Sequence, residues 1–447
     1  MRLVLLGLLL LLMLVLQQLH AHFPSDLGSR TALVFGFLLL AGFLLGELVA
    51  KFSIPRITGY LLAGMACGPS ALGFVDKEVI AHVNLVDHLA LALIAFTAGA
   101  ELKIDRLKER IRGIVTIAVV QSSCVFFGTA LTLWLLRAWV PIFAGLSEGQ
   151  ILAVSGILAV IASATSPSTA VAVIVESHAK GPVTDSVLGV TVVKDILVLV
   201  AFSMVLSLSA TSLGSAELAE QEGLGRIFAE VGLSLVVGFV AGGVMVAYLR
   251  FVGKQNVLFV VGAAFLLISL SKVFHLDALL VSVCAGFAVA NFSRQGKAFQ
   301  VGLEKASAPI FLIFFSISGA GLNLAVLGSF WHVVGLLVAI RAFFTWSGTW
   351  MGSYFSAEDE AVRRHAWTGF LGQAGVSLGL AALLRARLPE MGPWLADIIV
   401  GGIVVNQILG PIAFRWALVR VGEANLSQEN GQAQVPKAST SSLGRGS

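Results

Sequence analysis

The feature that most constrains this chain is a series of apolar segments, each of roughly 18 residues or more, that recurs from one end to the other. A segment of that length crosses the hydrocarbon core of a bilayer, which is about 30 Å thick. Only 12% of the residues are charged, which is about half the fraction of an ordinary soluble protein. The sequence therefore predicts a polytopic membrane protein.

Several other classes are disfavoured. The three cysteines, Cys67, Cys124 and Cys284, lie far apart inside apolar segments and suggest neither a disulfide framework nor a zinc site. No basic stripe for nucleic acid, no phosphate-binding glycine loop and no nucleophile–base pair is apparent. We therefore expect no cofactor, no nucleic-acid partner and no enzymatic activity.

We expect all-α architecture with thirteen membrane helices, since backbone polar groups in lipid must be satisfied within the segment. The alternation that marks membrane β-strands is absent. The expected spans are 31–50, 57–74, 83–100, 112–136, 147–175, 182–209, 225–250, 256–272, 275–293, 307–326, 330–353, 363–386 and 395–419.

Both ends of the chain lie outside this membrane domain of residues 31–420. Residues 1–21 hold one Arg, a Leu-rich run and a small residue at the end, the order of a signal peptide, although an additional N-terminal helix is the alternative. Residues 423–447 are rich in Ser, Gln, Asn and Gly, which predicts a disordered tail.

Loop charges predict the orientation in an inner (plasma) membrane, because cytoplasmic loops collect Lys and Arg. Loops after odd-numbered spans hold most of these residues, and the loop after the third span is the clearest case. The loop near residues 217–222 is instead acidic. The first span should therefore begin outside, after any signal cleavage, and the C-terminus should be cytoplasmic.

Thirteen spans permit two inverted repeats, 31–209 and 256–419, joined by a linker helix at 225–250. The fifth span contains Ala-Thr-Ser-Pro-Ser-Thr at 164–169, and its counterpart, the twelfth, contains Gly-Gln-Ala-Gly-Val-Ser at 372–377. Interrupted helices at matched positions of two repeats indicate a transport site.

Three charged residues lie at mid-membrane depth. Asp195 lies roughly 20 Å along the sixth span from Pro182, where an ionised carboxylate costs at least about 2.5 kcal/mol. A carboxylate that holds either a proton or a metal ion is the minimum for exchange, although a helix-pinning salt bridge is the structural alternative. Arg341 needs an acidic or carbonyl partner, and Asp195 is the candidate nearest in depth. Lys194 diverges from Asp195 by about 100° around the helix and is expected to contact Thr165, Ser166 or Asp195.

The interrupted fifth span offers hydroxyl oxygens from Thr165, Ser166, Ser168 and Thr169 around Pro167, suited to a monovalent cation. An ordinary proline kink is the alternative. Gln373 and Asn406 are expected to form hydrogen bonds between helices, and Gln373 is also expected to line the site. Asp277, Asp397 and Glu47 lie near span ends, where a solvated position is expected.

Two motifs carry a resemblance to a known family. Ile54 to Gly64 (Ile-Pro-Arg-Ile-Thr-Gly-Tyr-Leu-Leu-Ala-Gly), followed by Gly-Pro-Ser at 68–70, resembles the second-span signature of the monovalent cation:proton antiporter-2 family. Phe96 to Leu102 resembles its Phe-x-x-Gly-x-Glu-Leu element. The resemblance covers residues 31–420. It implies a sodium/proton-antiporter fold of thirteen helices with a dimerisation domain, a core domain, two crossed broken helices, and a homodimer with an elevator-like motion.

The sequence departs from this family at two positions. Lys194 occupies a position where many relatives have an acid, Asn or Gln, and Arg341 stands where Lys is common. The nucleotide-binding domain of the glutathione-gated potassium-efflux relatives is not found, so that gating is not expected. A single mid-membrane acid favours electroneutral exchange of Na⁺ or K⁺ for H⁺ at Asp195. Two alternatives stay open: an anion transporter that uses Lys194 and Arg341, and a pH or ligand sensor without transport.

Overall fold

The computed structural model describes residues 5–13, 15, 27–82, 84–209, 212–213, 224–251, 256–274, 276–322, 325–373, 375–388 and 391–425. Within these residues every regular element is a helix, which confirms the all-α prediction. The elements are α2 (Leu27–Ala50), α3 (Arg56–Cys67), α4 (Lys77–His82), α5 (Asn84–Glu101), α6 (Ile104–Leu135), η1 (Pro141–Phe143), α7 (Glu148–Ser163), α8 (Pro167–Glu176), α9 (Pro182–Ser209), α11 (Leu224–Phe251), α12 (Asn256–Val273), α13 (Ala278–Phe292), α14 (Gly296–Ala320), α15 (Ala325–Phe355), α16 (Glu360–His365), η2 (Ala366–Phe370), α17 (Gly375–Arg387) and α18 (Gly392–Arg420).

Twelve of the thirteen expected spans each coincide with one helix or one broken pair, and the remaining span, 363–386, covers α16, η2 and α17. Among the described residues, seven helices or broken pairs are long and apolar enough to cross a membrane, and four shorter apolar helices accompany them. The second span is shorter than expected, since α3 ends at Cys67 and its C-cap, Gly68, has an extended backbone. The tenth begins earlier, because α14 includes the polar residues from Gly296 onward.

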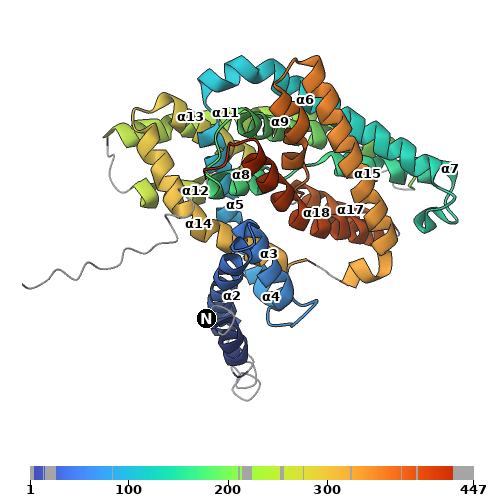
Figure 1. Cartoon of the computed structure of the whole chain (residues 1–447), viewed down its shortest axis with the longest axis horizontal. Coiled ribbons are helices and arrows are strands. Elements are labelled where there is room, and N and C mark those ends of the chain that lie inside the picture. Colours follow the sequence, from blue (N-terminus) through green and yellow to red (C-terminus); the bar gives the residue numbers. More distant parts are fainter. Residues whose placement is uncertain are drawn as a thin grey trace, which may run out of the picture.

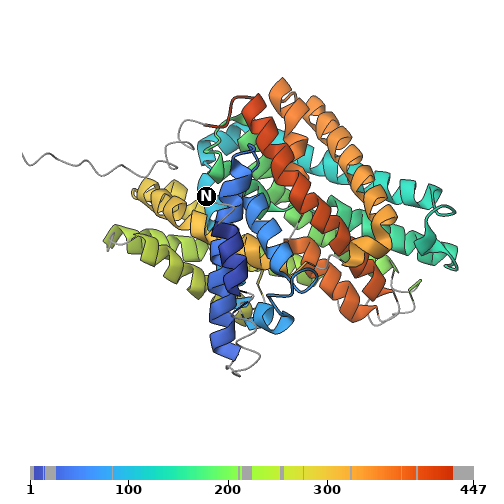
Figure 2. The same ribbon diagram turned by 60° about the horizontal axis from the view of Figure 1, so that its bottom comes forward.

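The helices form two bundles (Figure 1). In the core bundle, α6 packs against α7, α9 and α15, while α18 packs against α15 and α17. In the peripheral bundle, α5 packs against α12, α13 and α14, while α3 packs against α2 and α14, and α11 against α13. Figure 1 shows α12, α13 and α14 on one side and α7, α15 and α17 on the other, and Figure 2 shows α2 beside α3, running across the long axis of the molecule. The bundles meet where α5 contacts α8, α9 contacts α11, and α3 contacts α18.

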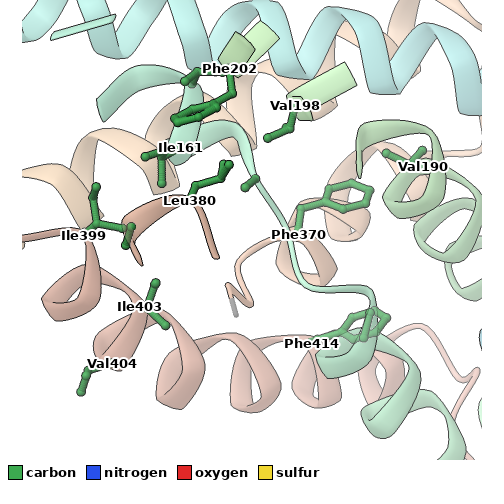
Figure 3. Packing of buried hydrophobic residues seen from close by; sticks show 14 of the residues in the cluster. Ile161, Val190, Val198, Phe202, Phe370, Leu380, Ile399, Ile403, Val404 and Phe414 are labelled. Atoms are coloured by element: carbon green, nitrogen blue, oxygen red, sulfur yellow. The ribbon is translucent and has the colours of Figure 1, made fainter. Parts of the chain in front are cut away.

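A large apolar cluster fills the core bundle with residues from α7, α9, η2, α17 and α18, and it continues into the peripheral bundle through residues of α3, α5 and α14. Figure 3 shows its packing around Phe370 and Phe414, whose side chains are fully buried. Phe370 belongs to η2, which is part of the interrupted twelfth span, and Phe414 belongs to α18, which packs against η2. Their burial positions those segments rigidly, because close-packed interiors tolerate little displacement.

The peripheral bundle depends on close helix crossings at glycine. A Cβ atom added at Gly99 of α5 would overlap the carbonyl oxygen of Val283 on α13, and one at Gly64 of α3 would overlap the carbonyl oxygen of Ser316 on α14. Small residues let membrane helices approach backbone to backbone. Gly99 belongs to the Phe96–Leu102 motif, so part of that motif has a packing role.

Charged residues join the two bundles near the ends of α3 and α8. The Arg56 backbone N–H donates to Glu176 Oε1 at 2.6 Å, and the Arg56 guanidinium donates to Glu47 at 2.7 Å. Arg415 of α18 lies 3.8 Å from the same Glu176 oxygen. Glu47, expected to be solvated, is therefore largely buried in an ion pair.

The chain after α18 turns back onto α9. Glu423 accepts hydrogen bonds from the backbone N–H groups of Val183 and Thr184 at 2.7 and 2.8 Å, and from the Thr184 hydroxyl at 2.7 Å. A carboxylate at a helix N-terminus satisfies unpaired donors and complements the helix dipole. Residues 423–425 are thus ordered, contrary to the expected tail boundary, and the tail residues 426–447 lie outside the described residues.

Candidate functional site

The interruptions predicted in the fifth and twelfth spans are both present, and they meet. The fifth span divides into α7 and α8, because Ser166 caps α8 by accepting from Thr169 N–H at 3.2 Å and Pro167 occupies the first helical position. The twelfth divides into η2 and α17, with residues 371–373 between them non-helical. The Ser166 N–H donates to the Gly372 carbonyl oxygen at 3.0 Å, which joins the two breaks directly.

Arg341 of α15 neutralises the carbonyl ends of the two leading half-helices. Its Nε donates to Ala162 O at 2.9 Å and one terminal nitrogen donates to Ala164 O at 2.9 Å, at the end of α7. The guanidinium also donates to Phe370 O at 2.9 Å and Leu371 O at 2.8 Å, at the end of η2. Helix C-termini carry partial negative charge, so a buried cation here is compensated by backbone dipoles. The prediction that Arg341 needs an acidic or carbonyl partner is met by backbone carbonyl groups, and the suggested pairing of Arg341 with Asp195 is not observed.

Lys194 and Asp195 of α9 have separate surroundings. Lys194 is 1% exposed, and its ammonium lies 5.5 Å from the centre of the Phe370 ring, a cation–π contact. Within the described part of the chain it forms neither predicted polar contact, with Thr165 or Ser166 or with Asp195. Asp195 instead lines a cavity between the bundles.

This cavity, of about 50 Å³, is bounded by both bundles. The core bundle contributes Asp195 and residues 165–168, and the peripheral bundle contributes parts of α5, α11 and α13. Its other lining residues are Ile94, Ala95, Ala98, Val192, Ile196, Leu199, Val231, Asp277, Leu279, Leu280 and Val283. Neither Lys194 nor Arg341 is among the lining residues, so the charged groups around the cavity are acidic.

The hydroxyls of the α7–α8 break divide into bonded and unbonded groups. Ser166 Oγ lies 2.9 Å from Ser168 Oγ and accepts from the Thr169 hydroxyl at 2.9 Å. Thr169 Oγ1 also contacts Gln407 Oε1 at 2.8 Å and, contrary to expectation, does not line the cavity. Thr165 Oγ1 is buried and has no hydrogen-bond partner among the described residues. Among the predicted oxygen ligands, Thr165 Oγ1 is therefore the atom whose missing partner an ion in the cavity would supply.

Comparison with known proteins identifies the kind of molecule that carries this site. The family described as "Sodium/hydrogen exchanger, transmembrane" matches residues 35–420. The chain belongs to the sodium/hydrogen exchanger family.

Solved structures agree with this assignment at the level of the fold. A structure of the sodium proton antiporter MjNhaP1 from Methanocaldococcus jannaschii at pH 8 has a TM-score of 0.67 and 16% identity, and the match covers 88% of this chain and 98% of that one. A structure of the same antiporter from an electron-microscopy map has a TM-score of 0.68 and 17% identity, covering 90% and 100%. The antiporter fold expected from the resemblance is confirmed.

Within this member of the exchanger family, Gln373 and Asn406 tie the second break to its neighbours, as expected, although Gln373 does not line the cavity of Asp195. Gln373 Nε2 donates to Ile161 O at 2.9 Å, and Asn406 Nδ2 donates to Gln373 Oε1 at 3.0 Å. Gln407 follows Asn406 on α18, and its Oε1 atom accepts a hydrogen bond from the Thr169 hydroxyl of α8. The sequence did not single out this residue. A polar Asn-Gln pair inside an apolar span is the signal that would have indicated it.

Asp277 is the main residue of this exchanger's cavity that sequence reasoning placed wrongly. Its Oδ1 accepts from the Leu280 N–H at 2.8 Å and caps α13, while its own N–H donates to Ser234 Oγ at 3.1 Å. Its carboxylate nevertheless lines the same cavity as Asp195, rather than a solvated face. Asp397 was also expected to be solvated. It is partly exposed and forms an ion pair with Arg385.

Proposed function

We propose that this member of the sodium/hydrogen exchanger family exchanges Na⁺ or K⁺ for H⁺, with Asp195 as the group that binds either ion. One observation carries the proposal. The Asp195 carboxylate lines the inter-bundle cavity together with the break that holds Thr165, whose buried hydroxyl oxygen has no partner among the described residues. Carboxylate and hydroxyl oxygens are the ligands that hard monovalent cations accept.

The chemistry of exchange follows from the position of Asp195. An ionised carboxylate at mid-membrane costs at least about 2.5 kcal/mol, and either a proton or a cation reduces that cost. A single carboxylate holds one of them at a time, so loading the cation releases the proton. Because Asp277 caps the start of a helix rather than lying inside one, Asp195 alone carries the exchange, which favours one-for-one electroneutral transport.

Alternating access fits the position of the cavity between the bundles. Movement of the core bundle past the peripheral bundle would carry the α7–α8 and η2–α17 breaks, held by Arg341, as one unit. The loop charges favour an orientation with the C-terminus inside, in an inner (plasma) membrane. As the resemblance implies, we expect a homodimer, which cross-linking in the membrane tests.

The positions of the Lys194 and Arg341 side chains favour a cation over an anion as the transported ion. An anion transporter would need Lys194 and Arg341 at the cavity, yet Arg341 donates to four backbone carbonyls and Lys194 lies over Phe370. The cavity is lined by two carboxylates, by the hydroxyl side chains of Thr165, Ser166 and Ser168, and by apolar side chains. This distribution favours a cation.

The test is purified protein in liposomes with an imposed pH gradient. Proton efflux is recorded on addition of Na⁺, K⁺ or Li⁺, with and without a potassium–valinomycin clamp. We expect efflux with at least one cation and no effect of the clamp. Absence of efflux with all three cations, from protein shown to be folded and inserted, would contradict the proposal and leave the sensor alternative.

A further inference from the structure

Asp277 shares the cavity of Asp195 but belongs to the other bundle. We propose that Asp277 is a cation-attracting residue at the outer end of the transport pathway, which raises the local concentration of Na⁺ or K⁺ before the ion reaches Asp195. This inference rests on the proposed function and assigns a role to a residue outside the break.

The path of the cavity supports this placement. Asp277 immediately precedes the first residue of α13, and Val231 lies in the N-terminal part of α11. On the other wall, the lining runs from Val192 and Asp195 to Leu199, toward the C-terminal end of α9. The cavity therefore extends from Asp195 toward the side of the protein on which α11 and α13 begin. That side is the external one in the predicted topology.

The cap of α13 does not by itself explain a carboxylate here. Asn and Ser cap helices about as well as Asp, and neither brings a charge into a cavity whose remaining walls are mostly apolar. The dipole of α13 favours a charged cap but compensates a full charge only in part. A charge in such surroundings loses hydration, which disfavours it unless a counter-ion compensates. Among the residues that line the cavity there is no Lys or Arg to act as that counter-ion. A cation on its way to Asp195 would supply the compensation.

The electrostatics of the cavity strengthen the effect. Apolar walls such as Ile94, Leu280 and Val283 keep the local dielectric low, so the field of a carboxylate is screened less than at an open surface. Clefts lined by charge of one sign raise the local concentration of the opposite ion. The Thr165 hydroxyl has no hydrogen-bond partner among the described residues, and Thr165 lines the same cavity, which is an independent indication that a ligand completes the site.

The experiment compares wild type with Asp277→Asn, which keeps a capping oxygen for Leu280 N–H and removes the charge. Right-side-out membrane vesicles receive external Na⁺ or K⁺ over a range of concentrations at low ionic strength, and proton flux is recorded against vesicles without the protein. We expect the apparent KM for the cation to rise about threefold to tenfold, with Vmax within about twofold. Added choline chloride should narrow the difference, because salt screens the charge.

Two further variants keep the result interpretable. Asp277→Glu restores the charge and should return KM toward the wild-type value. Asp397→Asn is the matched control, because it removes a carboxylate that does not line the cavity, and it should leave KM unchanged. Melting temperatures of all variants are measured in detergent, so that a lost cap is recognised as lost stability.

The outcomes separate this inference from the proposed function. Exchange in wild type with an unchanged KM in Asp277→Asn would overturn the role of Asp277 alone. A lowered Vmax with unchanged KM and an unchanged melting temperature would overturn it as well, since attraction acts on cation capture. Absence of cation-evoked flux in wild type would overturn both.

Discussion

Lys194 and Asp195 are consecutive residues of α9 whose side chains face different parts of the protein. The Lys194 ammonium lies over the Phe370 ring inside the core bundle, and the Asp195 carboxylate lines the cavity between the bundles. Neighbouring positions on a helix differ by about 100° in direction, and here that divergence separates a buried cation from the proposed ion site. Although Lys194 and Asp195 have opposite charges and are neighbours in the sequence, only Asp195 lines the cavity, so the cavity is acidic.

Replacement of Lys194 by Met should preserve exchange. Met fills a similar volume against Phe370 and removes the cost of a buried ammonium, which exceeds the roughly 1–2 kcal/mol of a cation–π contact. We expect a melting temperature equal to or above that of wild type and a cation-evoked flux within about threefold. Loss of flux in a stable Lys194→Met protein would instead place Lys194 in the transport step and revive the anion alternative.

Arg341 should be the most sensitive structural position near the site. Hydrogen bonds to charged groups contribute about 1.5–3 kcal/mol each, and this guanidinium donates to four carbonyls. Arg341→Ala is therefore expected to lower the free energy of unfolding by about 3 kcal/mol or more in detergent. Arg341→Lys should recover only part of this, because an ammonium lacks the planar array of five donors. Wild-type stability in Arg341→Ala would contradict the assignment.

Glu423 should stabilise the start of the helix that carries Asp195. Glu423→Ala removes three hydrogen bonds to residues 183 and 184 and leaves two backbone donors of α9 unsatisfied. The expected loss is about 2–3 kcal/mol of unfolding free energy, measured by thermal or denaturant unfolding. Glu360→Ala is the control, because Glu360 is exposed and forms a surface pair with Arg364. Equal stability of the two variants would show that the contact contributes little.

Glycine at the α5–α13 crossing should be irreplaceable. Gly99→Ala forces a methyl group into the Val283 carbonyl, so α5 and α13 must separate, at a cost of about 1–3 kcal/mol. Gly36→Ala is the matched control, since a Cβ there meets no atom within 4 Å. We expect the melting temperature to fall in Gly99→Ala and to hold or rise in Gly36→Ala. The reverse order would exclude a tight crossing at Gly99.

Local sequence signals predicted the breaks and the depth of Asp195 because those features are encoded within single segments. Ser favours the cap and Pro the first position of a helix, so the Ser166–Pro167 step favours a new helix start and predicts the α7–α8 break at residues 164–166. The length of the apolar run fixes the depth of Asp195. The position of Gln373 between helices likewise follows from one polar amide in an apolar span.

Other features depend on which segments meet, and no single segment encodes that. Asp277 reads as a solvated residue near a span end, and only the packing of α13 against α5 brings it to the cavity of Asp195. The carbonyl partners of Arg341 come from two spans far apart in the chain. Glu423 lies in a polar stretch that reads as disordered until its contact with α9 is known.

The most direct test of the proposed exchange is the proton flux evoked by Na⁺, K⁺ or Li⁺ in liposomes that contain either wild type or Asp195→Asn. Asn keeps the size of the side chain but neither titrates nor offers a charge to a cation. We predict that flux in Asp195→Asn falls to the level of protein-free liposomes, while gel filtration and melting temperature show a folded protein. Flux near the wild-type rate in folded Asp195→Asn would contradict Asp195 as the shared ion and proton site.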